Sequence, residues 1–459
     1  MRHIYVISDL HLGGDPHDPV VPGGRGFQMC KQGPLLARFI GALADRGDAV
    51  ELVIAGDFVD FLAERPSTGG WSPFHRQEAA RLLRTIAEER EPEVFSALRR
   101  LLAAGHRLTV LLGNHDMELS LPEVRRVLEE VVGAGPGRDL VFSYDNEAWT
   151  SGDLIIEHGN RADPANEVDH DALRRVRVLQ SRGLDDPRKA PFTPPVGSRI
   201  VAELMNPVKE RFPFVDLLKP ETTGLFPVLI ALHPAGALKL GRLAVQVGRI
   251  GGHAAVNAAA PRYGQAIAGG QRADAVETTL KASLPDDVAQ AVLAELRGGT
   301  GQAISGRRAL STLRAGVVAR VLKALVGEDR TLDTSAEGGA EYLRAAEELG
   351  RAGWKVVVFG HTHKAVHQTL DSGALYLNTG TWADLITVPE AILSDDPDEA
   401  RACCEAFLAD LSTGALERWI LRRPTYAHIV QDDAGQTLRA ELCEYVEADP
   451  DATANVLDR

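Results

Sequence analysis

Five short apolar segments, each followed at once by glycine, aspartate or histidine, are the feature that most constrains the fold of this chain of 459 residues. In chain order they are HIYVIS (3–8), ELVIA (51–55), RLTVLL (107–112), LIIE (154–157) and KVVVF (355–359). Such runs, rich in Val, Ile and Leu, are typical of strands buried on both faces. Helical patterns separate the first three runs, at residues 34–46, 76–90 and 93–104. This alternation predicts an α/β layered core, with β-sheets flanked by helices.

The middle of the chain has a different pattern. Strand signals are sparse between residues 161 and 353, while helical patterns recur at 169–182, 198–211, 273–296, 309–326 and 335–350. Strand patterns resume at residue 355 and return at 374–382, 425–430 and 437–446. We therefore expect a core in two parts, residues 1–160 and 354–459, interrupted by a large, mainly helical insertion at 161–353.

Composition excludes several classes of protein. Hydrophobic residues make up 44% and charged residues 25% of the chain, which is typical of a globular protein. The net charge of −14 disfavours broad nucleic-acid binding. The four cysteines form no CxxC pair, no apolar run is long enough for a transmembrane helix, and no signal-peptide pattern opens the chain. We expect a cytoplasmic protein, with peripheral contact to the inner face of the membrane as an alternative.

Residue types that bind metals follow every apolar run. They are Asp9 and His11 in DLH, Asp57 in GDFVD, Asn114 in GNHD, His158 in HGN, and His361 and His363 in GHTH. Carboxyl ends of strands in an open α/β sheet are where ligands bind. The two-residue spacing in DLH and HTH places both side chains on one side of an extended segment. Imidazole and carboxylate donors together favour a pair of divalent cations, Mn, Fe, Zn, Co or Ni, over Ca.

The five blocks, in this order, resemble the calcineurin-like metallophosphoesterase superfamily, whose pattern is DxH, GDxxD, GNH(D/E), a histidine at a strand end, and GHxH. The resemblance covers residues 1–161 and 354–388. It implies a calcineurin-like phosphoesterase core that holds two divalent metal ions, with manganese favoured. It also implies an enzyme in which a metal-bound hydroxide attacks the phosphorus of a phosphodiester or diphosphate.

The resemblance further implies a role for each residue. One metal is held by Asp9, His11, Asp57 and His363, and the other by Asp57 as a bridge, Asn114, His158 and His361. His115 contacts the phosphoryl oxygen and protonates the leaving group, while Asp116 accepts a hydrogen bond from its ring. Asp60 hydrogen-bonds a ligand histidine or a nearby loop, or is simply an acidic residue at a helix start.

Three questions stay open at this level. Arg161 either binds a substrate phosphate, as Arg does bidentately, or belongs to a turn before a capped helix. The apolar stretch 215–252 is either a lid that grips acyl chains or rests on a membrane, or a set of core helices or an oligomer interface.

The third question is the substrate. DLHL, GHTH and the intervening insertion resemble the UDP-2,3-diacylglucosamine diphosphatases of lipid A synthesis, which implies a lipid-linked diphosphate. This chain departs from that branch in the histidine of GNHD and in its longer insertion. A phosphodiesterase or nuclease acting on nucleotides or nucleic acid is the alternative, followed by a non-catalytic binding module.

Overall fold

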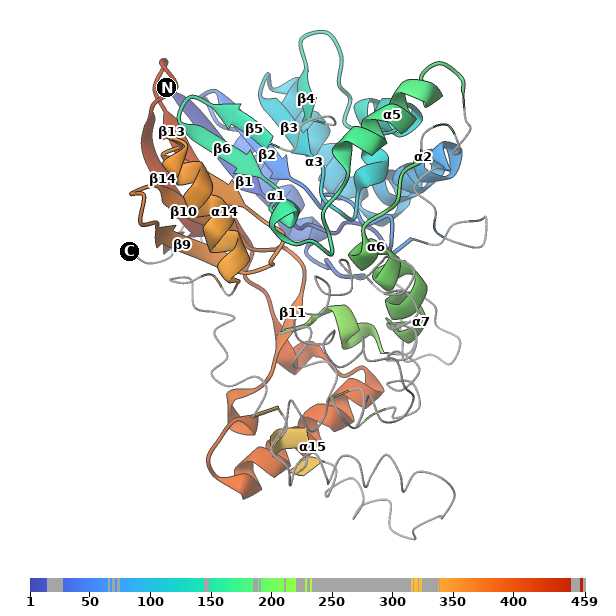
Figure 1. Ribbon diagram of the computed structural model, residues 1–459, viewed down its shortest axis with the longest axis vertical. Helices are drawn as coiled ribbons and strands as arrows, with labels where there is room; N and C mark the ends of the chain where they lie inside the picture. Colours follow the sequence, from blue (N-terminus) through green and yellow to red (C-terminus); the bar gives the residue numbers. More distant parts are fainter. Residues whose placement is uncertain are drawn as a thin grey trace.

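The computed structural model describes residues 1–14, 28–64, 67, 71, 75–143, 148–184, 189, 191–209, 212–219, 228, 232, 315–316, 318–320, 322–323, 337, 339–446 and 455–456. Two large sheets pack face to face and carry helices on their outer faces (Figure 1). The predicted α/β layered architecture is confirmed.

The first sheet has seven strands in the order β15-β14-β13-β1-β2-β3-β4. In chain order these are β1 (Arg2–Ile7), β2 (Val50–Ala55), β3 (Arg107–Leu111), β4 (Asp139–Ser143), β13 (Thr425–Gln431), β14 (Thr437–Glu444) and β15 (Asn455–Val456). Strands β1 to β4 run parallel, and β13 joins β1 antiparallel. Residues from the far end of the chain therefore complete a sheet that the first residues begin.

The second sheet has five strands in the order β5-β6-β8-β10-β9. They are β5 (Ala148–Ser151), β6 (Leu154–Glu157), β8 (Val356–Phe359), β9 (Ala365–Thr369) and β10 (Leu375–Thr379). Strands β6 and β8 pair in parallel although about 200 residues separate them in the chain. The last two of the five apolar runs are thus neighbours, and their carboxyl ends point the same way.

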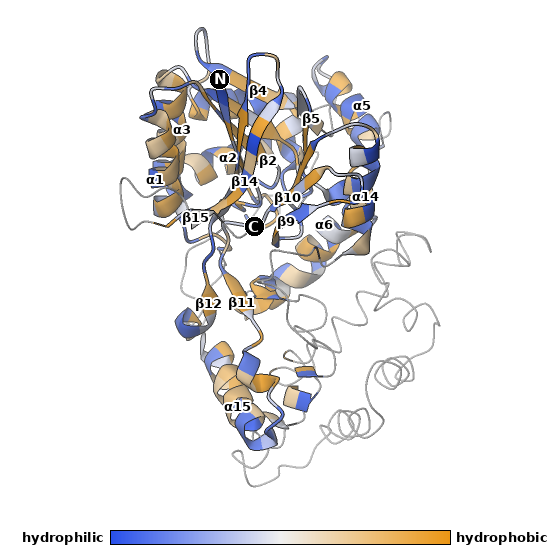
Figure 2. Cartoon of the chain, turned by 90° about the vertical axis from the view of Figure 1, so that its left-hand side faces the viewer, coloured by the Kyte–Doolittle hydropathy of each residue, from blue (hydrophilic) through white to orange (hydrophobic). Residues whose placement is uncertain are grey.

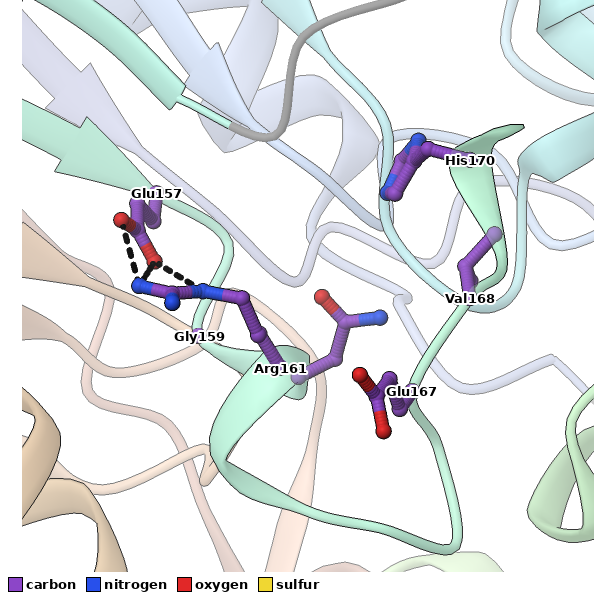
Figure 3. Close-up of a pocket in the computed structure, with 7 residues that line it drawn as sticks. Glu157, Gly159, Arg161, Glu167, Val168 and His170 are labelled. Atoms are coloured by element: carbon purple, nitrogen blue, oxygen red, sulfur yellow. Dashed lines mark hydrogen bonds and ion pairs between the residues drawn. The ribbon is translucent and has the colours of Figure 1, made fainter. Parts of the chain in front are cut away.

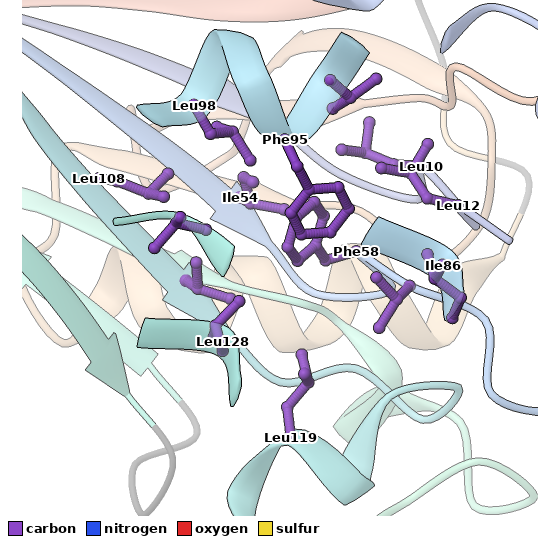
Figure 4. Close-up of a cluster of buried hydrophobic side chains, with 14 of the residues drawn as sticks. Leu10, Leu12, Ile54, Phe58, Ile86, Phe95, Leu98, Leu108, Leu119 and Leu128 are labelled. Atoms are coloured by element: carbon purple, nitrogen blue, oxygen red, sulfur yellow. The ribbon is translucent and has the colours of Figure 1, made fainter. Parts of the chain in front are cut away.

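Side-chain alternation explains the layers. In β1, Ile4 and Val6 face the core between the two sheets, while Tyr5 and Ile7 face the helices outside. The helices over the first sheet are α1 (Gly33–Ala44), α2 (Arg76–Thr85), α3 (Pro92–Ala103), α4 (Pro122–Val131) and α5 (His170–Gln180). Figure 4 shows this outer core, where Phe58 and Phe95 lie side by side among leucines and isoleucines.

On the outer face of the second sheet lies α14 (Ala340–Arg351), which buries Tyr342 and Ala346. The expected helix at 76–90 forms, with α2 continuing as a π-helix at Ile86–Arg90. Of the helix expected at 198–211, the described residues to 209 are helical: α6 (Val196–Ile200) reaches α7 (Asn206–Lys209) through a π-helical turn at Val201–Met205. The expected helix at 273–296 lies outside the described residues. Among the described residues, no helix has the length and apolar content needed to cross a membrane.

A smaller lobe has its own hydrophobic cluster. Its sheet, ordered β12-β11-β7, consists of β7 (Leu218–Lys219), β11 (Leu385–Thr387) and β12 (Ile420–Leu421). Figure 2 shows β11, β12 and α15 (Pro397–Thr413) below the two large sheets. Described residues before and after the predicted boundary at 353 share this cluster. The division of the chain into 1–160, 161–353 and 354–459 stays a prediction, and most of 215–252 lies outside the described residues.

Candidate metal centre

The carboxyl ends of β1, β2, β3, β6 and β8 bring the predicted site residues together. Three overlapping groups of side chains each have ligand atoms within 4.8 Å of one another and could hold a cation. The groups are Asp9, His11 and His363; His11, Asp57 and His115; and Asp57, His158 and His361. Asn114 joins the third group, because its Oδ1 lies 3.3 Å from Nε2 of His158. All seven predicted ligands therefore lie in one cluster, in which His361 and His363 are partly buried and the others buried.

Backbone strain is concentrated in the same residues. Among the described residues, the non-glycine positions with positive φ are Asp9, His11, Asp57, His361 and His363, with φ between 43° and 69°. The prediction of an extended backbone at DLH and HTH is therefore wrong. The site residues of these two loops adopt the left-handed conformation instead. That conformation costs about 1–3 kcal/mol per residue, and such strain clusters at functional sites.

Glycines make room for the predicted ligands. A Cβ atom on Gly56 would lie 2.6 Å from the ring of His158. One on Gly113 would overlap the carboxylate of Asp57, and one on Gly360 would overlap the side chains of Ser8 and Asp9. The glycine in each of GDFVD, GNHD and GHTH is thus required by close approach.

Asp57 lies at the centre of the cluster. Its Oδ1 accepts a hydrogen bond from the backbone N–H of His115, at 2.9 Å. Its Oδ2 lies 3.7 Å from Nε2 of His11 on one side and 3.3 Å from Nε2 of His158 on the other. One carboxylate oxygen thus faces an imidazole from each of two donor groups.

The group around Asp9 completes one side. Nε2 of His363 lies 3.0 Å from Nε2 of His11 and 3.4 Å from Oδ1 of Asp9. Oδ2 of Asp9 accepts a hydrogen bond from the backbone N–H of His361, which ties the DLH loop to the GHTH loop. The first and the last block of the sequence pattern are therefore in direct contact.

Asp60 is the carboxylate next to His115. Its Oδ1 lies 3.2 Å from Nδ1 of His115, and its Oδ2 lies 3.4 Å from Nδ1 of His11. The hydrogen bonds that Asp60 accepts come from the backbone N–H groups of Leu62 and Ala63, so the expected bond to a nearby loop is confirmed, while its contact with the predicted ligand His11 is one of proximity. The expected partner of His115 is not confirmed: Asp116 accepts backbone hydrogen bonds from Gly113 and Phe58, both at 2.7 Å, and so holds the loop rather than the ring.

The electrostatics of the cluster follow from its burial and its facing charges. Burial opposes ionisation of Asp57, but His158 and His115 hold the pKa of this carboxyl well below its usual range. Burial disfavours the charged form of His158 as well, yet Asp57 raises the pKa of that ring to about 10. A cation bound here would displace the proton from His158, so metal binding is coupled to proton release.

Residues 2–207 match the model of the calcineurin-like phosphoesterase family. This part of the chain is a calcineurin-like phosphoesterase domain. The match includes the first four blocks of the pattern, and the structure adds the fifth, GHTH, through the pairing of β8 with β6. A search of curated proteins finds no match to the chain.

The phosphoesterase domain is that of a metal-binding hydrolase acting on phosphoester bonds. A second observation, which does not depend on the family match, supports the fit of its buried donors to divalent cations. Oδ1 of Asp9 and Nδ1 of His363 are buried, and neither has a hydrogen-bonding partner among the described residues. Buried polar atoms are rarely left in this state unless a ligand satisfies them.

Arg161 of the phosphoesterase domain lies beside the cluster but is turned to another partner. Its guanidinium forms a bidentate ion pair with Glu157, with N–O distances of 3.0 Å and 3.3 Å (Figure 3). The two residues line a small pocket together with Glu167 and His170. With 46% of its side chain exposed, Arg161 remains accessible, and its role in substrate binding stays a prediction.

Two further residues of the site follow His158 closely in the sequence, whose pattern assigned them no specific role. Asp163 lies 3.3 Å from Nε2 of His361, and Asn166 contacts the side chains of both Asp163 and Asn114. The Asp-Pro pair at 163–164 resembles an ordinary turn signal in sequence. The spacing of this turn behind His158 was the one hint available.

Proposed function

We propose that the chain is a phosphohydrolase with two divalent cations, and that it hydrolyses a small phosphodiester or diphosphate. The observation that carries this proposal is the position of Asp57, whose Oδ2 faces His11 and His158 at 3.7 Å and 3.3 Å. A carboxylate between two imidazole groups is suited to bridge two cations about 3.5–4 Å apart. When bound, such a pair supplies Lewis acidity to the phosphoryl group and a nucleophilic water.

His11, His363 and Asp9 would hold one cation with Asp57. His158, His361 and Asn114 would hold the other, also with Asp57. The Nδ1–H group of His158 donates to the carbonyl of Ala55, at 2.9 Å, which leaves its Nε2 facing Asp57. Burial excludes water from most of these side chains, which strengthens their interaction with a phosphate.

His115 is placed to move a proton. Burial lowers its pKa, but Asp60 and then Asp57 raise the pKa to about 9, which favours the protonated ring in the metal-free protein. Since its Nδ1 faces Asp60, its Nε2 is the atom left to donate a proton to the leaving oxygen. The side chain of His115 is 14% exposed, more than that of Asp60, which suits contact with an entering substrate.

The charge of the chain supports a small substrate rather than a polynucleotide, because a net charge of −14 repels long phosphate backbones. Manganese is the cation we would try first. A lipid-linked substrate and contact with a membrane remain proposals that depend on residues 215–252.

A hydrolysis panel tests the proposal. Bis-p-nitrophenyl phosphate, p-nitrophenyl phosphate, cyclic nucleotides and a UDP-diacylglucosamine-type diphosphate are each assayed with added Mn²⁺ and again after chelation. We expect chelator-sensitive turnover of a diester or diphosphate. His115→Ala should keep its metal, measured by mass spectrometry, and lose about 10²–10⁴-fold in turnover. Turnover that is unaffected by chelation would refute the proposed metal dependence.

A further inference from the structure

The turn that follows His158 connects two predicted ligands of the same cation. Asp163 reaches His361, which comes from the end of β8, and Asn166 reaches Asn114, which comes from the end of β3. We propose that Asp163 and Asn166 are positioning residues that select the coordinating atoms of His361 and Asn114. The inference rests on the proposed function, in that it concerns the cation held by Asp57, His158, His361 and Asn114.

The contact of Asp163 determines which nitrogen of His361 is protonated. Oδ2 of Asp163 lies 3.3 Å from Nε2 of His361 and also accepts a hydrogen bond from Nδ2 of Asn166, at 2.7 Å. An ionised carboxylate can only accept hydrogen bonds, so Nε2 of His361 must carry the proton. The lone pair of the neutral ring is then on Nδ1, which is the atom available to a cation.

The contact of Asn166 determines the orientation of the Asn114 amide. The Nδ2 group of Asn166 is already used toward Asp163, so its Oδ1 is the end that faces Asn114, and Nδ2 of Asn114 donates to it at 3.4 Å. The Oδ1 atom of Asn114 is then directed to the side of His158, at 3.3 Å from Nε2 of that ring. A reversed amide would present a donor to the cation, which binds only acceptors.

Further hydrogen bonds within the turn hold Asp163 and Asn166 in place. Oδ1 of Asp163 accepts from the backbone N–H of Ala165, at 2.9 Å, and the carbonyl of Asn166 accepts from Nδ2 of Asn160, at 2.8 Å. Both oxygens of Asp163 are thus occupied by donors from the chain. Asp163 belongs to none of the groups of described side chains that could hold a cation, so we assign it an action on His361 rather than the role of a ligand.

The start of α6 packs against the turn that carries Asp163 and Asn166. The backbone N–H of Gly197 donates to the carbonyl of Ala165, at 2.8 Å, and a Cβ atom on Gly197 would overlap the side-chain amide of Asn166. Gly197→Ala therefore displaces Asn166 without altering any predicted ligand. It provides an independent test in which neither Asp163 nor Asn166 is itself substituted.

The experiment measures Mn²⁺ binding rather than turnover. Metal-free protein is titrated with Mn²⁺ in equilibrium dialysis, for the wild type, Asp163→Asn, Asn166→Ala and Gly197→Ala. Asp171→Asn is the matched control, since this carboxylate pairs with Arg174 on the exposed surface of α5. We expect two Mn²⁺ per chain in the wild type, and in each of the three variants one Mn²⁺ weakened about 10–100-fold with the other unchanged.

Circular dichroism of the metal-free forms controls for folding. If Asp163→Asn fails to fold, Gly197→Ala decides. Unchanged affinity of both cations in the folded variants, or equal weakening of both, would overturn the inference while the proposed function stands. A wild type that binds fewer than two Mn²⁺ would overturn the proposed function and the inference with it.

Discussion

Neutralising Asp60 is the most informative single change, because this buried carboxylate lies beside two catalytic-site rings at once. It is 1% exposed and lies 3.2 Å from Nδ1 of His115 and 3.4 Å from Nδ1 of His11. Asp60→Asn keeps the size of the side chain and removes its charge. The backbone bonds from Leu62 and Ala63 to its Oδ1 can be kept by the amide oxygen.

The expected magnitude follows from the pKa of His115. Burial lowers that pKa, and Asp60 with Asp57 raises it from 6.5 to about 9. A difference of this size corresponds to about 3 kcal/mol in favour of the protonated ring. Without Asp60, the larger of the two charges that raise it, the pKa of His115 should fall toward its ordinary value of 6.5 as the limit. At pH 8 the protonated fraction then drops from about nine rings in ten to about one in thirty.

The assay is the pH profile of kcat/KM from pH 5.5 to 10, using the diester that the wild type turns over best. We expect Asp60→Asn to lose about 10–100-fold at pH 8 and to shift the alkaline limb of the profile toward neutral pH. Substrates with an alkoxide leaving group should be affected more than p-nitrophenyl esters, because p-nitrophenolate needs little protonation. Metal content is measured in the same samples.

The matched control is Asp153→Asn. Asp153 is also a buried carboxylate, but its partners are Thr437 and Lys355. It precedes β6, whereas the candidate metal centre lies at the carboxyl end of that strand. The Asp153→Asn variant should leave the pH profile unchanged. An Asp60→Asn enzyme with wild-type profile and full metal content would refute the role given to Asp60.

Three further changes probe the site and the core. Asp57→Asn should weaken both cations together, and two tightly held Mn²⁺ per chain by mass spectrometry would contradict a bridging role. Gly113→Ala should abolish Mn²⁺ binding, because the added Cβ atom overlaps the carboxylate of Asp57. Gly47→Ala is the control: its added Cβ atom meets nothing within 4 Å, so this variant should bind Mn²⁺ as the wild type does in the same titration. Phe95→Ala removes a ring that is 0% exposed and lies 5.5 Å from the ring of Phe58. Urea denaturation should show that the free energy of unfolding falls by about 3–5 kcal/mol. A fall of under about 1 kcal/mol would show that the surrounding side chains fill the cavity.

The strands and the order of the site residues could be predicted from the sequence, because both depend on local pattern. The run 154–157 is β6 as expected, and the run 355–359 contains β8, Val356–Phe359. What the pattern could not show is that these strands pair with each other in a second sheet. Pairing across about 200 residues depends on tertiary packing, which no local window contains.

The details of the site were less accessible. The left-handed backbone of Asp9 and His11 is uncommon for non-glycine residues, although Asp and His adopt it more often than most, and the surrounding contacts impose it here. For a similar reason the sequence led to the wrong carboxylate beside His115: the residue there is Asp60 and not Asp116. Both carboxylates lie in family motifs, and only the fold determines which one finds backbone donors and which one finds a ring.

The pairing of β6 with β8 also means that residues of one site are synthesised at well-separated times. His361 and His363 leave the ribosome about 200 residues after His158, which takes roughly 10–40 s at about 5–20 residues per second. Throughout that interval the nascent chain carries Asp9, Asp57 and His158 without their last partners. A cation bound during that interval would be held by an incomplete set of the predicted donors. On the proposed function, the full set of donors for both cations exists only once β8 has paired with β6.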